Sequence, residues 1–542
     1  MQTERYLRKP VAARRALEQR KRTLALGILL ALGVAGVLAL LLVGCGGGSA
    51  APIAPPPIAP VTALQIADVQ KIVQAAVNSA NVDMVVAVVD RAGFVLGVFR
   101  TQNAPATAVG NFGQALDAND VAVALARTGA FFSNDQAPLS SRTVRFISGI
   151  HFPPGVMNQP PADLYGIENT NRGCALVNTA AFQNQIPPSL AQGGGFGLGV
   201  LTGKADTTDS NPLAVNPGGV PIFYQNVVVG GIGVVTSSSD PNVAEYAAFA
   251  GSTTQRTGPS DSFGPSPAAP GVVFIGGIAL PFVTQSSLPA GVSVGPVAGA
   301  GAYFVAPANS AGQPPEGDLI APAAGPLGGL SATDVQTILD NAEATANTTR
   351  AAIRLPLGSR ARMVIAVADL DGTIIGLRRM QDSTVFSIDV AASKARNMVY
   401  FNSSARTAAD LNQVPMGTAV TNRTISFGAQ PFFPPGIDGS AAGPFFNLFL
   451  QDLANPCTQG MQAGAPNVNK SGIVFFPGSA GLYRNGALVG GLGISGDGVD
   501  QDDYVTNGGT LGFEAPTSIR ADQISINGVR LPYFKFPRNP TD

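Results

Sequence analysis

Three stretches of residues 331–542 carry apolar side chains at helical spacing. The first runs from Val335 to Ala342 behind Ser331 and Thr333, either of which could cap the helix N-terminus. The second covers about 388–401, and the third begins near Asp500. These stretches predict three helices, each with one apolar face that can pack on a sheet.

Between the helices lie short apolar runs with the pattern of strands. Residues 364–369 and 373–378 flank an Asp-Gly pair, which is a strong signal for a hairpin. Further runs occur at 472–476 and 487–494, the second of them after an Asn-Gly turn. Strands joined by hairpins, with helices at the edges, predict an α+β fold with a mainly antiparallel sheet and flanking helices.

The same order of segments occurs twice along the chain, which indicates two related domains. These domains are predicted at 62–305 and 331–542, with 306–330 as the linker and extra Gly-, Pro- and Ser-rich loops in the first. The matching segments are 66–73 with 332–339, 86–90 with 365–369, 120–127 with 389–396, 142–155 with 423–436, 229–233 with 489–493, and 280–282 with 531–533.

Residues 1–44 have the pattern of a signal peptide or membrane anchor. Eight Lys and Arg residues lie within 1–22, and Thr23–Val43 contains no charge. Cys45 follows this run in a sequence that resembles the bacterial lipobox, where the signal is cleaved before a cysteine that becomes lipidated. An uncleaved signal anchor is the alternative. Either one would attach the chain to a membrane of the cell envelope, facing the periplasm, through the Gly/Pro-rich linker 45–61.

The composition excludes several classes of function. The net charge is −1 and only 12% of the residues are charged, so the chain lacks the field that gathers nucleic acid. The single histidine, His151, excludes multi-histidine metal sites and makes any Ser-His-Asp triad depend on it alone.

Three segments of the second copy carry a resemblance to a known family. They are the hairpin 364–378, the helix 387–396 with the sequence SIDVAASKAR, and the segment 490–496 with the sequence GGLGISG. In this order they resemble the GlcG/HbpS-like family, which includes the C-terminal domain of PduO-type proteins. The resemblance covers both copies and implies two tandem profilin-like domains that pair with each other. It also implies possible further oligomers and, as in several members, the binding of haem or iron.

Charged residues recur at corresponding places in the two copies. An aspartate ends the first strand of the hairpin, another begins the second helix, and an arginine follows in that helix. The second copy adds Lys394 where the first has Leu125. These residues could form the polar rim of a ligand pocket, with Lys394 meeting a haem propionate or another acid. Turns, helix caps and salt bridges are the structural alternative. The residues are Asp90, Asp120 and Arg127, and Asp369, Asp389, Lys394 and Arg396.

Several residues offer ligands for a haem iron. His151 could ligate iron, or it could make a local hydrogen bond in its loop. In the second copy Met380, Met398, Tyr400 and Lys394 could serve, although methionine usually packs in the core.

Two further segments suggest chemistry but also have structural explanations. The acidic segment 497–503 could hold Ca²⁺ or Mg²⁺, or it could place Asp500 at the cap of a helix with other aspartates in the first turn. The glycines of 490–496 superficially resemble a nucleotide-binding loop, but close backbone packing explains them more simply. The identity of any metal therefore stays open.

Each copy contains one cysteine at a similar place. Cys174 and Cys457 follow the Phe-Pro-Pro-Gly glycines of their copies by 19 and 21 residues. In an oxidising compartment this placement predicts a disulfide between the two domains, with separate thiols as the alternative.

Three hypotheses on function follow. The first is an extracytoplasmic, lipid-anchored protein that binds a small molecule, with haem as the leading ligand. The second is a structural or assembly lipoprotein without a ligand. The third is a haem-linked redox or degradation enzyme, for which the sequence supplies no recognisable acid–base pair or nucleophile.

Overall fold

The structure is a computed structural model of the chain, and it describes residues 63–109, 115–148, 216–258, 260–264, 273–275, 278–280, 282–304, 313–430, 432–435, 437, 439–454, 459–461 and 472–542. Within the unit Pro55–Asp542 we call 63–304 the first half and 313–542 the second half. The predicted membrane segment with Cys45, and also His151, Cys174 and Cys457, lie outside the described residues. None of the described helices combines the length and the apolar character needed to cross a membrane.

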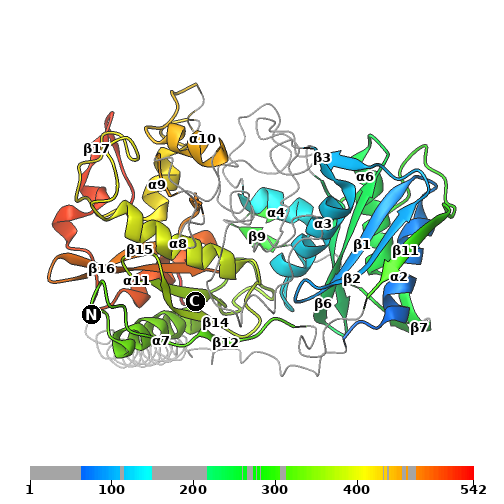
Figure 1. The fold of residues 1–542 in the computed structure, drawn as a ribbon, viewed down its shortest axis with the longest axis horizontal. Coiled ribbons are helices and arrows are strands. Elements are labelled where there is room, and N and C mark those ends of the chain that lie inside the picture. Colours follow the sequence, from blue (N-terminus) through cyan, green and yellow to red (C-terminus); the bar gives the residue numbers. More distant parts are fainter. Residues whose placement is uncertain are drawn as a thin grey trace, which may run out of the picture. The chain divides into compact units, whose positions relative to one another are not determined.

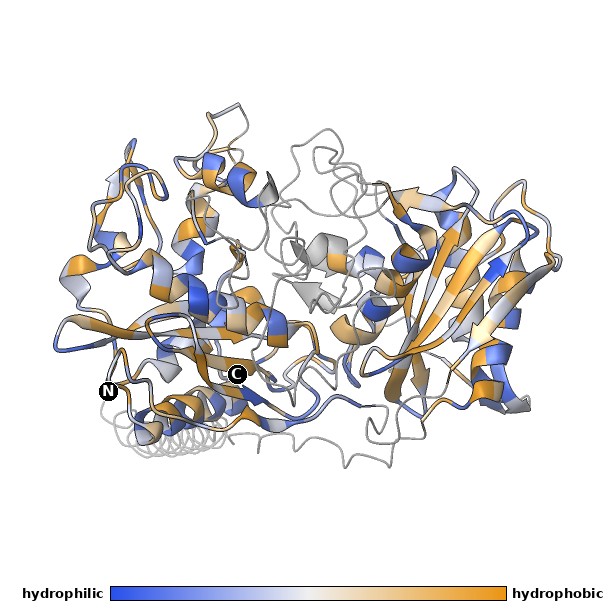
Figure 2. Cartoon of the chain, in the orientation of Figure 1, coloured by the Kyte–Doolittle hydropathy of each residue, from blue (hydrophilic) through white to orange (hydrophobic). Residues whose placement is uncertain are grey.

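The first half contains a five-stranded antiparallel sheet in the order β11-β2-β1-β6-β5 (Figure 1). Helix α3 packs on one face of this sheet, and α2 and α6 pack on the other. Both faces are therefore covered, and β1 is buried along its whole length. Figure 2 shows hydrophobic positions running along the central strands. The elements are α2 (Ile66–Ser79), β1 (Met84–Asp90), β2 (Val95–Thr101), β3 (Thr107–Val109), β4 (Ala115–Asp117), α3 (Ala118–Phe132), α4 (Ser141–Ser148), β5 (Gly219–Tyr224), β6 (Val227–Thr236), α6 (Pro241–Ser252), β7 (Gln255–Gly258), β8 (Asp261–Ser262), β9 (Val273–Ile275), β10 (Ile278–Leu280) and β11 (Gly299–Tyr303).

The second half contains a five-stranded antiparallel sheet in the order β12-β14-β13-β16-β15. Helix α8 packs on one face, and α7 and α11 pack on the other. The elements are β12 (Gly317–Ile320), α7 (Ala332–Thr348), β13 (Val364–Ala368), β14 (Ile374–Arg379), α8 (Ser387–Phe401), α9 (Asn422–Gly428), α10 (Phe446–Ala454), β15 (Ser479–Arg484), β16 (Ala487–Ser495), α11 (Val499–Gly509), the 3-10 helices Thr517–Ile519 and Ala521–Gln523, β17 (Ser525–Ile526) and β18 (Val529–Arg530).

The inner four strands and their three helices follow the same order in the two halves, whereas the edge strands do not. In the first sheet the edge strand β11 comes after α6, and in the second sheet the edge strand β12 comes before α7. The prediction that 306–330 is only a linker is therefore wrong, because 317–320 pair with β14. The predicted α+β class with antiparallel sheets is confirmed.

The predicted elements of the second half are mostly confirmed, as α7, α8, α11, β13, β14 and β16. Ser331 caps α7 and forms a capping box with Asp334. The Asn485-Gly486 turn has φ angles of 52° and 80°, as a two-residue hairpin requires. Two predictions are wrong. The strand before this turn is β15 rather than 472–476, and Asp500 lies in the first turn of α11, whose cap is Gly498.

Glycines let the central helices approach the sheet with backbone against backbone. A Cβ atom added to Gly491 or Gly493 would lie well under 3.0 Å from carbonyl oxygens of α8, and one at Gly231 or Gly233 would lie equally close to carbonyl oxygens of α3. A side chain at these positions would therefore push the helix off the sheet. Close packing, as predicted, explains these glycines.

The substitution Gly493→Ala should destabilise the chain by about 1–3 kcal/mol, because the added methyl group overpacks the contact with α8. Urea unfolding followed by circular dichroism would measure this loss. Gly264→Ala is the control, because a Cβ at Gly264 meets open space. Equal stability of the two variants would contradict the packing argument.

Candidate functional site

The structure places Asp90 and Asp369 in the hairpin turns, where they bind backbone. The Asp369 carboxylate accepts hydrogen bonds from the backbone N–H groups of Leu327 (3.0 Å) and Gly328 (2.8 Å). The Asp90 carboxylate accepts one from Phe94 N–H at 2.9 Å. Both aspartates are almost fully buried. The Asp90 carboxylate thus bonds within its own hairpin, which was the structural alternative, whereas the Asp369 carboxylate holds the segment before α7.

Arg127 and Arg396 make the same contact in the two halves. Each donates a hydrogen bond of 3.0 Å from Nε to the carbonyl of the hairpin-turn glycine, Gly93 or Gly372. Burial lowers the pKa of both guanidinium groups to about 10. Both nevertheless stay charged at neutral pH and tie the central helix to the hairpin.

Asp120 and Asp389 begin the central helices but have different surroundings. Asp389 is almost fully buried, its Oδ2 has no hydrogen-bond partner among the described residues, and burial raises its pKa well above the usual value. Asp120 is half-buried and lines a pocket. The two positions therefore present different chemistry.

Lys394 is fully buried in an ion pair. Its Nζ donates to the Ile494 carbonyl at 2.5 Å and to the Asp502 carboxylate at 2.9 Å, and it lies 5.5 Å from the centre of the Phe476 ring. Burial lowers the pKa of Lys394 and raises that of Asp502 to about 7. Lys394 is thus paired inside the second half, and its predicted contact with the acid group of a ligand stays a prediction.

The acidic segment 497–503 forms salt bridges. Asp497 pairs with Arg354, whereas Asp500 and Asp503 both pair with Arg423. Across the part of the chain that the structure describes, no three His, Cys, Asp or Glu side chains are placed to share a metal ion. These aspartates are therefore held by arginines, and of the structural alternative only the placement of aspartates in the first turn of α11 agrees with the structure.

The first half repeats the salt bridge of α11. Arg142 Nε lies 2.7 Å from Glu245 Oε1, and its Nη2 donates to Asn242 at 3.3 Å. These residues correspond to Arg423, Asp503 and Asp500. The matching segments 142–155 and 423–436 each begin with an Arg-Thr pair, which pointed to Arg142 and Arg423. The sequence did not show their acidic partners, because these lie about 80–100 residues further on.

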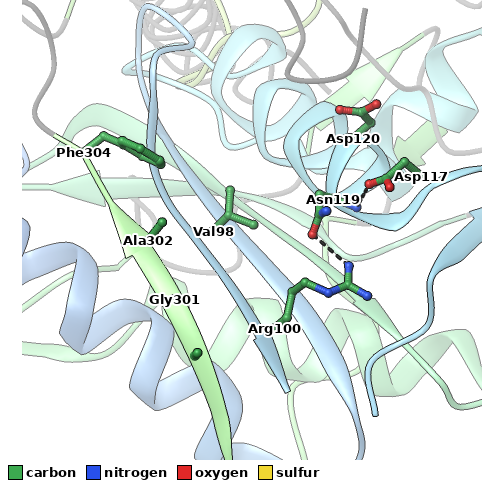
Figure 3. Close-up of a pocket in the computed structure, with 9 residues that line it drawn as sticks. Val98, Arg100, Asp117, Asn119, Asp120, Gly301, Ala302 and Phe304 are labelled. Atoms are coloured by element: carbon green, nitrogen blue, oxygen red, sulfur yellow. Dashed lines mark hydrogen bonds between the residues drawn. The ribbon is translucent and has the colours of Figure 1, made fainter. Parts of the chain in front are cut away.

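A pocket of about 530 Å³ lies at the edge of the first sheet, beside the N-terminus of α3 (Figure 3). The edge strand β11 builds one side, because Ala300 pairs with Arg100 and Ala302 pairs with Val98. The residues that line the pocket are Val98, Arg100, Asp117, Asn119, Asp120, Ala300, Gly301, Ala302 and Phe304.

The pocket has an apolar wall and a polar wall. Val98, Ala302 and the 46% exposed Phe304 lie together, away from the polar residues at the start of α3 (Figure 3). Arg100 is held in place by Asn119 Oδ1 at 2.8 Å and by the Pro105 carbonyl at 2.9 Å. This arrangement suits a small molecule with an apolar face and a hydrogen-bonding end.

Asp117 orients the polar wall. Its Oδ1 accepts a hydrogen bond of 2.8 Å from Asn119 N–H and so caps α3. Sequence analysis found Asp120 of this wall but missed Arg100 and Asp117. Strand β11 was missed because Gly299–Tyr303 has the sequence GAGAY, without the alternation of apolar and polar residues that marks a strand.

Among the described residues, the side chains that line the pocket include no ligand for a haem iron. None of the nine lining residues is His, Cys, Met or Tyr. The predicted candidates Met380 and Met398 are buried in the core of the second half, and the Tyr400 hydroxyl donates to Asp410 at 2.9 Å. The described lining of the pocket therefore does not fit an iron that needs a protein ligand.

These features define an α+β protein with helices on both faces of antiparallel sheets. Residues 330–510 match the family described as haem degrading protein HbpS-like, which confirms the predicted resemblance for that part of the chain. A comparison with curated proteins gives no match.

Three solved structures are among those similar to part of this chain. The PduOC–haem complex is 24% identical over 35% of this chain and 97% of that chain, with a TM-score of 0.23. Klebsiella pneumoniae ORFY is 18% identical over 34% and 90%, with a TM-score of 0.22. A double mutant of Streptomyces reticuli HbpS is 20% identical over 38% and 95%, with a TM-score of 0.20.

The ion pair of Lys394 and Asp502 provides a test of the buried charges. In the first half, Leu125 and Ala244 stand at these positions and are buried. Lys394→Leu alone should cost about 3–5 kcal/mol of stability, because it leaves a buried carboxyl group without its partner. The double variant Lys394→Leu/Asp502→Ala should recover most of that loss in urea unfolding. A double variant as unstable as the sum of the single variants would contradict this account.

Proposed function

We propose that the chain is an extracytoplasmic, lipid-anchored binding protein for a small, largely apolar molecule, built from two HbpS-like modules. The observation that carries this proposal is the pocket beside α3, which joins an apolar wall to fixed polar groups. Its volume of about 530 Å³ lies within the range of small-molecule sites, which is ~300–1,000 Å³.

The two-module interpretation is supported by contacts that recur in both halves. The Ser140 hydroxyl donates to the Phe282 carbonyl, and the Thr421 hydroxyl donates to the Tyr533 carbonyl. The arginine–glycine contacts and the salt bridges onto α6 and α11 recur as well. A common ancestral module is the simplest origin for such a set.

Haem is the first ligand to test, because the matched family is described as haem degrading and one similar structure is a haem complex. In the pocket, Arg100 would meet an acid group, and Val98 and Phe304 would contact the apolar faces. The carboxylates of Asp117 and Asp120 oppose a dianion, so the affinity should respond to the charge of this wall.

Metal-free protoporphyrin IX should bind the full chain about as tightly as haemin, within about twofold, because the described residues that line the pocket offer the iron no ligand. Fluorescence and absorbance titrations of the chain in lipid nanodiscs, with empty nanodiscs as the blank, would measure both dissociation constants. The absence of saturable binding by either porphyrin would overturn the proposed ligand class. Tighter haemin binding that is lost in His151→Ala would move the site to His151.

Two charge variants test whether this pocket is the site. Arg100→Ala should weaken porphyrin binding about tenfold, since it removes a charged hydrogen-bond donor. Asp117→Asn should tighten binding about two- to fivefold by removing a like charge, and asparagine still caps the helix. Arg378→Ala is the control, because it removes a half-buried arginine of the second sheet that forms salt bridges with its own half. Unchanged affinity in both pocket variants would place the ligand elsewhere.

We also propose that Cys45 carries the lipid anchor. Cys45→Ser should abolish the acyl mass. If the signal of this variant is cleaved at another position, the body should leave the membrane fraction. If the signal is not cleaved, an unprocessed precursor should remain. Mass spectrometry of the natural chain should find an acylated N-terminal Cys45 peptide. Peptides from residues 1–44 in the mature chain would instead show an uncleaved anchor.

The disulfide between Cys174 and Cys457 is part of the same proposal, because the periplasm is oxidising.

A further inference from the structure

The positions that line the pocket have counterparts in the second half. Arg100 pairs with Ala300 of the edge strand, and Arg379 pairs with Gly317 of the other edge strand. The strand register and the position along the central helix match five pocket residues to residues of the second half. Val98, Arg100, Asp117, Asn119 and Asp120 correspond to Leu377, Arg379, Phe386, Ile388 and Asp389.

These counterpart positions are closed to solvent. Leu377 and Ile388 are 0% exposed, and Phe386 is 3% exposed. Arg379 donates to the Ser383 carbonyl at 3.0 Å and to the Pro314 carbonyl at 3.3 Å. The surface that is open beside α3 is therefore covered beside α8.

The cover is the C-terminal end of α3. The Phe132 ring stacks on the Phe386 ring with 3.9 Å between centroids and an angle of 9° between planes. The Phe131 carbonyl accepts hydrogen bonds from the N–H groups of Val385 (2.9 Å) and Phe386 (3.4 Å). Phe132 is itself fully buried, and one hydrophobic cluster includes it together with Leu377 and Phe386.

Polar contacts hold this helix end in position. Asp382 accepts from Asp135 N–H at 3.2 Å and from Arg354 Nη1 at 2.6 Å, and it lies 3.8 Å from Arg91 Nη2. The Asn134 side chain donates to the Ile353 carbonyl at 3.2 Å. Charged and neutral hydrogen bonds thus hold the residues that follow α3 against the second half.

The equivalent end of α8 cannot close the first pocket in the same way. Phe401, at the position of Phe132, packs within the second half in a cluster with Leu411 and Phe445. Asn402 then bonds to the backbone of Val420 in both directions, at 3.1 Å and 2.7 Å. This helix end is covered by its own half.

We infer that the second half contains a closed counterpart of the pocket, filled by Phe132, and that the chain therefore binds one ligand at its open site. This inference rests on the proposed function for its stoichiometry. Leu377, Phe386 and Ile388 give the closed site an apolar lining, so removal of Phe132 would leave space for a small acid with one aromatic ring, such as benzoate.

Thiol labelling tests the closure without any ligand. Val385→Cys and Leu116→Cys occupy corresponding positions, and Leu116 is half-buried whereas Val385 is fully buried. In the full chain in nanodiscs, N-ethylmaleimide should label the thiol from Leu116→Cys at least about tenfold faster than that from Val385→Cys, as read by peptide mass spectrometry. Adding Phe132→Ala should speed labelling at position 385 by about tenfold, and Phe132→Leu should do so to a lesser extent.

Phe401→Ala is the matched control, because it removes an equally buried ring at the corresponding position. It should leave labelling at position 385 unchanged while lowering the melting temperature. Fast labelling at 385 in the chain with Phe132 intact would overturn the closure, and so would no response to either Phe132 variant in folded protein. In the second arm, protoporphyrin IX should bind at one equivalent per chain both before and after Phe132→Ala, and two equivalents in the unmutated chain would contradict a single open site. The Phe132→Ala chain should in addition bind benzoate, because the space left by one phenyl ring admits one aromatic ring. If the labelling follows the expected pattern but no porphyrin binds, the proposed function is refuted and the closure is supported.

Discussion

The arrangement of each half depends on one close contact, the backbone of a sheet strand against the backbone of the central helix. Gly231 and Gly233 permit it for β6 and α3, and Gly491 and Gly493 permit it for β16 and α8. A side chain at these places would increase the spacing between helix and sheet. At a larger spacing, Arg127 and Arg396 would no longer reach the hairpin turns at 3.0 Å. The start of α3, which forms the polar wall of the pocket, is fixed through the same contact.

Sequence reasoning identified the elements whose signals are local. Helical spacing and capping by Ser331 predicted α7, and the Asp-Gly and Asn-Gly turns located the hairpins. The edge strands β11 and β12 could not be predicted in this way. They are short and partly exposed, and their side chains carry no alternating pattern, so pairing with β2 or β14 is what makes them strands.

The charged residues show a second limit. Their recurrence in both copies was visible, but whether a carboxylate lines a pocket or ties down a turn depends on what lies beside it. Asp369 faces the N–H groups of Leu327 and Gly328, which the sequence places about 40 residues away. Lys394 was assigned to a ligand, yet its partner Asp502 lies 108 residues further on. Long-range pairing of this kind leaves no local signal.

The two halves distribute their polar groups in opposite ways over the same framework. Beside α3 the pocket wall is polar, with Asp117 and Asn119, while the interior position of Leu125 is apolar. Beside α8, Phe386 and Ile388 take the places of Asp117 and Asn119 next to the retained Arg379 and Asp389, and the interior carries the Lys394 ion pair instead. An apolar wall left in water would cost free energy, so it needs a cover, whereas a polar wall remains stable when exposed. The exchange of Asp117 for Phe386 thus accounts for an open site in one half and a packed contact in the other, without any change in the order of the inner strands.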